Sequence, residues 1–246
     1  MTKRGIITCL AGIIGCAGVA QADFSVGGLA GTGVTADISF AYAVTDDSNA
    51  TITISIHNTT VDSGDTAGAF ISAFGFNMPS ISGVTIDSFG GDVDDGVVQV
   101  VTLLGAPNES GWYGRFDPDE IKTPNAAGFF DYGVMNNSSV DAFITDGIGA
   151  SPNIIPGETT TFTIAVTGTG LSSLTASSFL SALSVGGSAG AFNFAVRFKG
   201  IGPDDDSDLA VTVVPVPSSV ILCTLGLGSI GLLQRSKRHS LVRATA

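Results

Sequence analysis

The sequence predicts an all-β protein, an antiparallel β-sandwich of jelly-roll type with about nine strands. In residues 50–58, Ile52, Ile54 and Ile56 alternate with Thr, Ser and His side chains, the period of a strand with one buried face. Clusters of Gly, Asp, Asn and Pro, such as residues 62–65, separate this segment from similar ones. The 246 residues are 44% hydrophobic, which excludes a disordered acidic chain and allows a substantial core.

The expected strands share β-prone side chains and are bounded by turn residues. They are residues 37–44, 50–58, 69–76, 83–89, 97–104, 128–134, 159–167, 191–198 and 209–214. Residues 171–183 favour one or two helical turns, in which Phe179, Leu180 and Leu183 would share an apolar face.

Charges divide the chain into a domain and two terminal segments. All 22 carboxylates lie between Asp23 and Val214, where only four basic residues occur, so this stretch carries a net charge of −18. Such acidity excludes nucleic acid as an expected partner, because phosphate binding needs Lys and Arg. The three cysteines lie outside this stretch, which therefore has no disulfide to stabilise it.

The N-terminus has the three parts of a secretory signal peptide. Lys3 and Arg4 precede a largely apolar run at residues 5–19, and Ala20-Gln21-Ala22 supplies small residues at the two positions that a signal peptidase reads. We therefore expect residues 1–22 to be removed by cleavage before Asp23, and the rest to be exported. Acylation of Cys16, which ends a lipoprotein-like Ile-Ile-Gly-Cys box, is the alternative.

The C-terminus is organised as a linker, an apolar segment and a basic tail. A β-sandwich domain is expected at 23–209 and a Pro-rich linker at 210–219, which contains Val214, Pro215, Val216 and Pro217. Residues 220–234 form a short candidate transmembrane helix, and the tail at 235–246 would stay in the cytoplasm through its basic side chains, Arg235, Lys237 and Arg238.

This order of prolines, apolar run and basic cluster resembles the PEP-CTERM sorting signal of Gram-negative surface and extracellular-matrix proteins. The Pro-Glu-Pro motif of that family falls on Pro215, Val216 and Pro217, with Val in place of Glu. The resemblance implies an exosortase-type protease as partner. It also implies an intermediate anchored in the inner membrane, followed by release to the cell surface or the extracellular medium.

Two sets of residues are candidates for ligand binding. Trp112, Tyr113 and Tyr132 could stack on sugars, which would make the domain a carbohydrate-binding module; a glycoside hydrolase using Glu109 or Glu120 ranks below it. Closely spaced carboxylates favour calcium as the one candidate cofactor. They are Asp92, Asp94 and Asp95 in one Gly-rich segment, and Asp204, Asp205, Asp206 and Asp208 in another.

No catalytic residue is predicted. His57 is the single histidine of the central stretch, and no G-x-S-x-G motif accompanies it, so we interpret it as a solvent-facing strand residue. The leading hypothesis is an exported, non-enzymatic surface or biofilm-matrix protein. Its negative field would keep copies soluble and let cations bridge them to each other or to exopolysaccharide.

Overall fold

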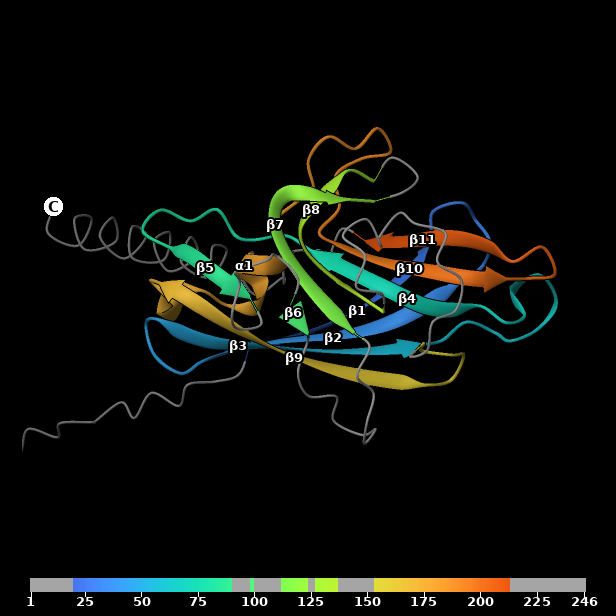
Figure 1. Ribbon diagram of the computed structural model, residues 1–246, viewed down its shortest axis with the longest axis horizontal. Helices are drawn as coiled ribbons and strands as arrows, with labels where there is room; N and C mark the ends of the chain where they lie inside the picture. The colour runs from blue at the N-terminus through green and yellow to red at the C-terminus, as the bar shows by residue number, and fades with distance from the viewer. Residues whose placement is uncertain (1–19, 90–97, 100–111, 124–126, 137–152, 213–246) are drawn as a thin grey trace, which may run out of the picture.

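The computed structural model describes residues 20–89, 98–99, 112–123, 127–136 and 153–212, and these residues form an all-β domain (Figure 1). Eleven strands pair in one antiparallel sheet, in the order β5-β9-β3-β2-β1-β11-β10-β4-β8-β7-β6. The strands are β1 (Ala20–Gly28), β2 (Thr35–Val44), β3 (Asn49–Asn58), β4 (Phe70–Phe76), β5 (Thr85–Phe89), β6 (Val98–Gln99), β7 (Tyr113–Lys122), β8 (Phe129–Met135), β9 (Thr159–Thr169), β10 (Phe194–Ile201) and β11 (Asp206–Thr212).

The sheet folds back on itself, so its two halves pack face to face as a sandwich. Strands β2, β3 and β9 lie in the lower layer of Figure 1, and β4, β10 and β11 lie in the upper layer. The layers are joined where β1 pairs with β11, and the described pairs there are Gly27–Val211 and Gly28–Ala210. The prediction of an antiparallel sandwich is confirmed, with the correction that both layers belong to one continuous sheet.

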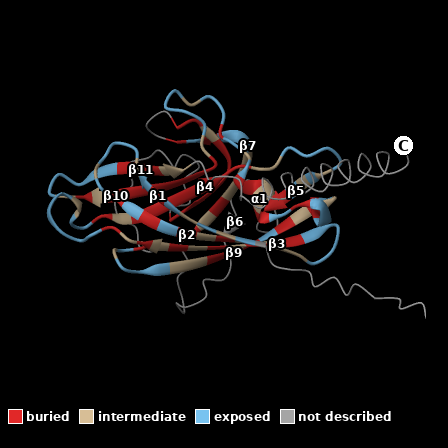
Figure 2. Cartoon of the chain, turned by 180° about the vertical axis from the view of Figure 1, so that it is seen from behind, coloured by how far each residue is buried: buried red, intermediate tan, exposed pale blue. Residues whose placement is uncertain are grey.

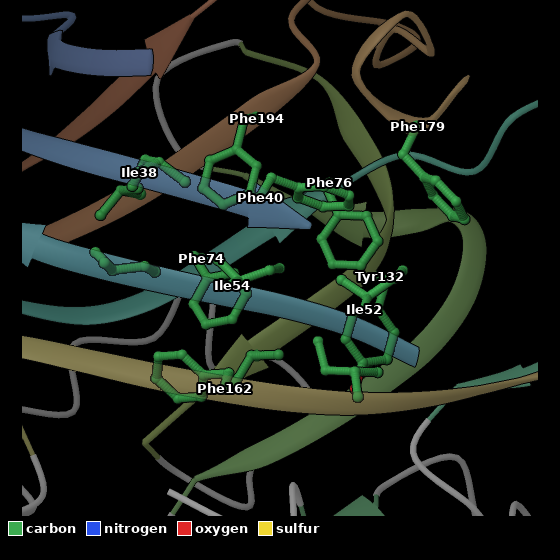
Figure 3. Close-up of a cluster of buried hydrophobic side chains, with 14 of the residues drawn as sticks. Ile38, Phe40, Ile52, Ile54, Phe74, Phe76, Tyr132, Phe162, Phe179 and Phe194 are labelled. Carbon is green, nitrogen blue, oxygen red and sulfur yellow. The ribbon is translucent and has the colours of Figure 1, made fainter. Parts of the chain in front are cut away.

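Aromatic rings from both layers fill the interior (Figure 3). The rings of Phe74 in β4 and Phe162 in β9 have centroids 4.8 Å apart, and those of Phe40 in β2 and Phe76 in β4 are 5.6 Å apart. Such ring pairs add about 0.5–1.5 kcal/mol each to the free energy of burial. With no cysteine in this part of the chain, these contacts hold the layers together.

The alternating sequence pattern explains the first layer. Ile52, Ile54 and Ile56 of β3 are fully buried, whereas the residues between them are half-buried on the outer face. Figure 2 shows this alternation as red and paler bands along β2 and β3. In the second layer, β4, β8 and β10 are buried on both faces for most of their length.

Each of the nine predicted segments contains a strand, and two further strands, β1 and β7, were not predicted. The helical prediction is confirmed in part, as the 3₁₀ turn η2 (Leu171–Ser173) and the helix α1 (Ala176–Leu180). Phe179 and Leu180 are buried, but Leu183 is 47% exposed. Leu183 does not share their face because α1 ends at Leu180.

Candidate functional site

A groove of about 680 Å³ crosses one end of the sandwich. Its walls are the loop after β4 (residues 78–81), the start of β5, the middle of β7, and α1 with the residues that follow it. Ile81, Leu183 and Val185 on its rim are all at least 40% exposed, while Asp131 in its lining is 8% exposed. The groove therefore combines an apolar rim with a nearly buried carboxyl group.

Asp131 lies in the groove because β7 bulges there. Four residues of β7, 117–120, stand opposite the single residue Asp131 of β8, between the pairs Phe116–Tyr132 and Ile121–Phe130. Pro118 removes a backbone donor at this point, and Asp119 adopts a φ of +59°, a conformation that Asp tolerates better than most residues. The bulge turns the backbone N–H of Asp119 towards the Asp131 carboxylate.

Both carboxylate oxygens of Asp131 accept hydrogen bonds from the backbone. The N–H of Asp119 donates to Oδ1 at 2.7 Å, and the N–H of Met78 donates to Oδ2 at 2.7 Å. Burial raises the pKa of Asp131; the two donors oppose that shift, and the nearby Asp119 carboxylate adds to it. Asp131 therefore braces the β4–β5 loop against the β7 bulge, a contact that no local sequence pattern indicates.

The structure contradicts the sugar-stacking role of Trp112 and Tyr132. Both side chains are 1% exposed, and the Trp112 ring packs edge-on against Phe162 at 5.0 Å. Tyr113 packs against a separate cluster around Ile121 and Phe130, apart from the core that holds Trp112. The three rings therefore form no common platform, because they stabilise the core instead.

The candidate calcium residue Asp208 has a structural role. Its carboxylate is fully buried and accepts hydrogen bonds from the Ala30 N–H at 3.0 Å, the Thr32 hydroxyl at 2.6 Å and the Leu209 N–H at 2.7 Å. A Cβ on Gly28 would lie 2.3 Å from Oδ2, so this close approach requires glycine. Asp208 thus ties β11 to the turn between β1 and β2.

The remaining acids of that segment are exposed: Asp204 and Asp205 lie in the turn between β10 and β11, and Asp206 is the first residue of β11. Within the described residues, no three His, Cys, Asp or Glu side chains are grouped closely enough to hold a metal ion. The other calcium candidates, Asp92, Asp94 and Asp95, lie outside the described residues.

Of the two candidate hydrolase acids, Glu120 is exposed in the β7 bulge and does not line the groove, and Glu109 lies outside the described residues. His57 bonds through Nδ1 to the Thr159 hydroxyl at 2.8 Å, while Ser55 bonds to Thr161 at 2.7 Å. These are pairs across β3 and β9 on the outer face of the sheet, with no serine–histidine contact.

Three of the residues predicted to be processed lie in the first strand of the sheet. Ala20, Ala22 and Asp23 belong to β1, where Ala20 pairs with Tyr42 and Ala22 with Phe40 of β2. Val214, Pro215, Val216, Pro217, Arg235, Lys237, Arg238 and Cys16 lie outside the described residues, as does the apolar segment 220–234. In the part of the chain that is described, no helix has the length and apolarity to cross a membrane.

The fold defines the chain as an antiparallel β-sandwich with an acidic surface. Comparison with known proteins adds no relative: no family model, curated protein or solved structure matches it.

Proposed function

We propose that the chain is an exported, non-enzymatic protein of the cell surface or extracellular matrix. In this proposal the C-terminal sorting signal holds it in the inner membrane until an exosortase-type protease processes it. The observation that carries the proposal is that the described sheet lies between the two signals, apart from its first three residues, 20–22, which fall within the expected signal peptide. Strand β1 begins at Ala20, three residues before the expected cleavage, and β11 ends at Thr212, two residues before Val214.

The topology supports tethering at one end of the domain. Strands β1 and β11 are antiparallel neighbours, so the chain enters β1 from, and leaves β11 towards, the same end of the sheet. Residues 1–19 and the C-terminal apolar segment are therefore connected to the same end of the sandwich. A domain connected in this way can stand on a membrane with its opposite end directed away from the lipid.

The acidic surface supports a physical rather than a catalytic role. Hydrogen bonds lower the pKa values of two adjacent exposed acids: the Ser48 N–H binds Asp46, and the Ser172 hydroxyl binds Asp47 at 2.5 Å. These side chains therefore keep their charge in mildly acidic surroundings. A field of this sign repels other copies and attracts cations, which can bridge the protein to an acidic polysaccharide.

Expression of the full chain in a Gram-negative host that has an exosortase-type protease tests the proposal. The wild type should be recovered from the cell surface or medium, and a variant that ends at residue 213 should accumulate in the periplasm. Val216→Glu, which restores the Pro-Glu-Pro motif, should be processed at least as efficiently as the wild type. Equal distribution of the wild type and the truncated variant would overturn the proposal.

A further inference from the structure

The groove at the end of the sandwich where β5, β7 and α1 meet carries an excess of negative groups (Figure 1). Asp119 and Asp131 are among its described lining residues, and none of those is Lys, Arg or His. The backbone N–H groups of Met78 and Asp119 favour the charged form of Asp131, whereas the nearby Asp119 carboxylate opposes it. In the described lining, two carboxyl groups therefore lie together without a positive side chain to neutralise them.

The Asp131 carboxylate keeps acceptor positions that the backbone does not use. Each of its oxygens accepts one backbone hydrogen bond at 2.7 Å, and a carboxylate offers about four lone-pair positions in all. Asp131 is 8% exposed and lines the groove, so a donor that reaches it from the groove is largely shielded from water. Shielding strengthens a charge-assisted hydrogen bond, because the local dielectric constant is lower than that of water.

The large apolar side chains that remain exposed gather at the same groove. Among the described residues six such side chains are exposed, and three of them, Ile81, Leu183 and Val185, line it. Exposed apolar surface next to polar groups is typical of a binding site. The volume of about 680 Å³ also lies within the range of about 300–1,000 Å³ for small-molecule sites. The groove thus offers apolar contact beside a shielded carboxylate.

We propose that the groove binds a soluble organic ammonium ion, whose –NH₃⁺ group pairs with the carboxylates of Asp131 and Asp119 and whose hydrocarbon part contacts Leu183 and Val185. An ammonium group supplies three N–H donors and one positive charge, which suit the acceptor positions that the backbone leaves. A calcium ion suits the groove less well, because the described residues group no three metal-ligating side chains there. An anionic lipid surface is also a poorer partner, since the stretch between Asp23 and Val214 carries a net charge of −18.

Two neighbouring acids of the β7 bulge supply a variant and its matched control. Asp119 and Glu120 are both exposed, but only Asp119 lines the groove. Asp119→Asn removes the charge and keeps the local backbone, since Asn tolerates a φ of +59° as Asp does. Glu120→Gln makes the same change of charge in the same bulge, outside the groove. A difference between the two variants therefore measures the groove and not the general field of the acidic surface.

Titration of the full chain with butylammonium chloride, in micelles of an uncharged detergent, tests the proposal. The amides of Met78 and Asp119 report on binding by NMR, because they donate to Asp131. We expect both signals to shift to saturation with a Kd of about 1 mM, the scale for a ligand of few atoms. Asp119→Asn should weaken this affinity about fivefold, and Glu120→Gln less than about twofold. Butanol, which has the same hydrocarbon part and no charge, should shift neither signal.

The apolar part of the site is tested with Leu183→Ser and with methylammonium. Leu183 is 47% exposed, so its replacement should leave the fold intact. The variant should bind butylammonium about threefold more weakly and methylammonium as the wild type does, because the shorter ion buries no hydrocarbon chain against the rim. A melting temperature is measured for each variant, so that a loss of affinity is not mistaken for unfolding.

Equal affinity of the wild type and Asp119→Asn for butylammonium would overturn the proposal, and so would an equal response to butanol. Saturable shifts of the same two amides with calcium chloride, and none with butylammonium, would assign the groove to a metal ion instead. These measurements do not depend on export or processing, so they are independent of whether the tail directs sorting.

Discussion

Replacement of Asp208 by alanine gives the sharpest test of how the sandwich is held together. The fully buried Asp208 carboxylate accepts three hydrogen bonds, from Ala30, Thr32 and Leu209, at 2.6–3.0 Å. Hydrogen bonds to a charged group contribute about 1.5–3 kcal/mol each, and such contributions are not additive. We expect Asp208→Ala to lower the free energy of unfolding by about 3–5 kcal/mol, because two backbone donors lose their acceptor.

For a domain of this size, a loss of that magnitude lowers the melting temperature by about 10 °C. Asp208→Asn should cost only about 1 kcal/mol, because its amide oxygen can keep the backbone bonds and the Thr32 hydroxyl can rotate to accept. Thermal unfolding of the full chain in mild detergent, followed by circular dichroism, measures both changes.

Asp204→Ala is the control, since Asp204 is exposed on the adjacent turn and its loss should change stability by less than about 0.5 kcal/mol. Each protein is melted with calcium and with EDTA. The Asp208→Ala effect should be the same in both, because the carboxylate oxygens bind protein donors. Equal melting temperatures for the two alanine variants, or an Asp208 effect seen only with calcium, would show that these hydrogen bonds do not stabilise the sandwich.

Three further predictions follow from contacts in the core and at the turns. Trp112→Ala should destabilise the domain by about 3–5 kcal/mol in chemical unfolding without changing retention on glycan columns; unchanged stability would place the ring outside the core. Ser172→Ala should raise the pKa of Asp47 towards its ordinary value in an NMR titration. A carboxyl group whose pKa is lowered by folding stabilises the protein at pH values above its unfolded pKa, and this stability is lost as the pH falls through its folded pKa. The variant should therefore lose stability at neutral pH, and little once the pH is below the folded pKa of Asp47. Gly168→Ala should destabilise by about 1–3 kcal/mol, because a Cβ would lie 2.0 Å from the Thr85 carbonyl; an unchanged melting temperature would contradict this close approach.

The strands that could be predicted from sequence are those with one buried face, in which every second residue is apolar. Strand β3 is the clearest, since Ile52, Ile54 and Ile56 alone define its inner face. Strand β7 was missed because its period is interrupted: residues 117–120 bulge out opposite Asp131, and their charges and proline are typical of a loop. Strand β1 was missed because Ala20 and Ala22 also match a cleavage signal, and pairing with β2 decides their conformation in the intact chain.

The roles of single side chains were harder to predict than the strands. Asp208 and Thr32 are 176 residues apart in the chain, so no local pattern could show that the carboxylate accepts a bond there. An isolated Trp next to Tyr and acids is compatible with a sugar platform or with a core. The burial of Trp112 against Phe162 depends on how β9 crosses the other layer, which the local sequence does not specify.

The intact mass of the protein recovered from the cell surface or medium shows whether the chain is exported and processed at both ends. We expect a chain that begins at Asp23 and lacks the apolar segment 220–234 and the basic tail. A full-length chain confined to the cytoplasm would contradict it. A lipid-modified chain that begins at Cys16 would contradict the predicted cleavage before Asp23.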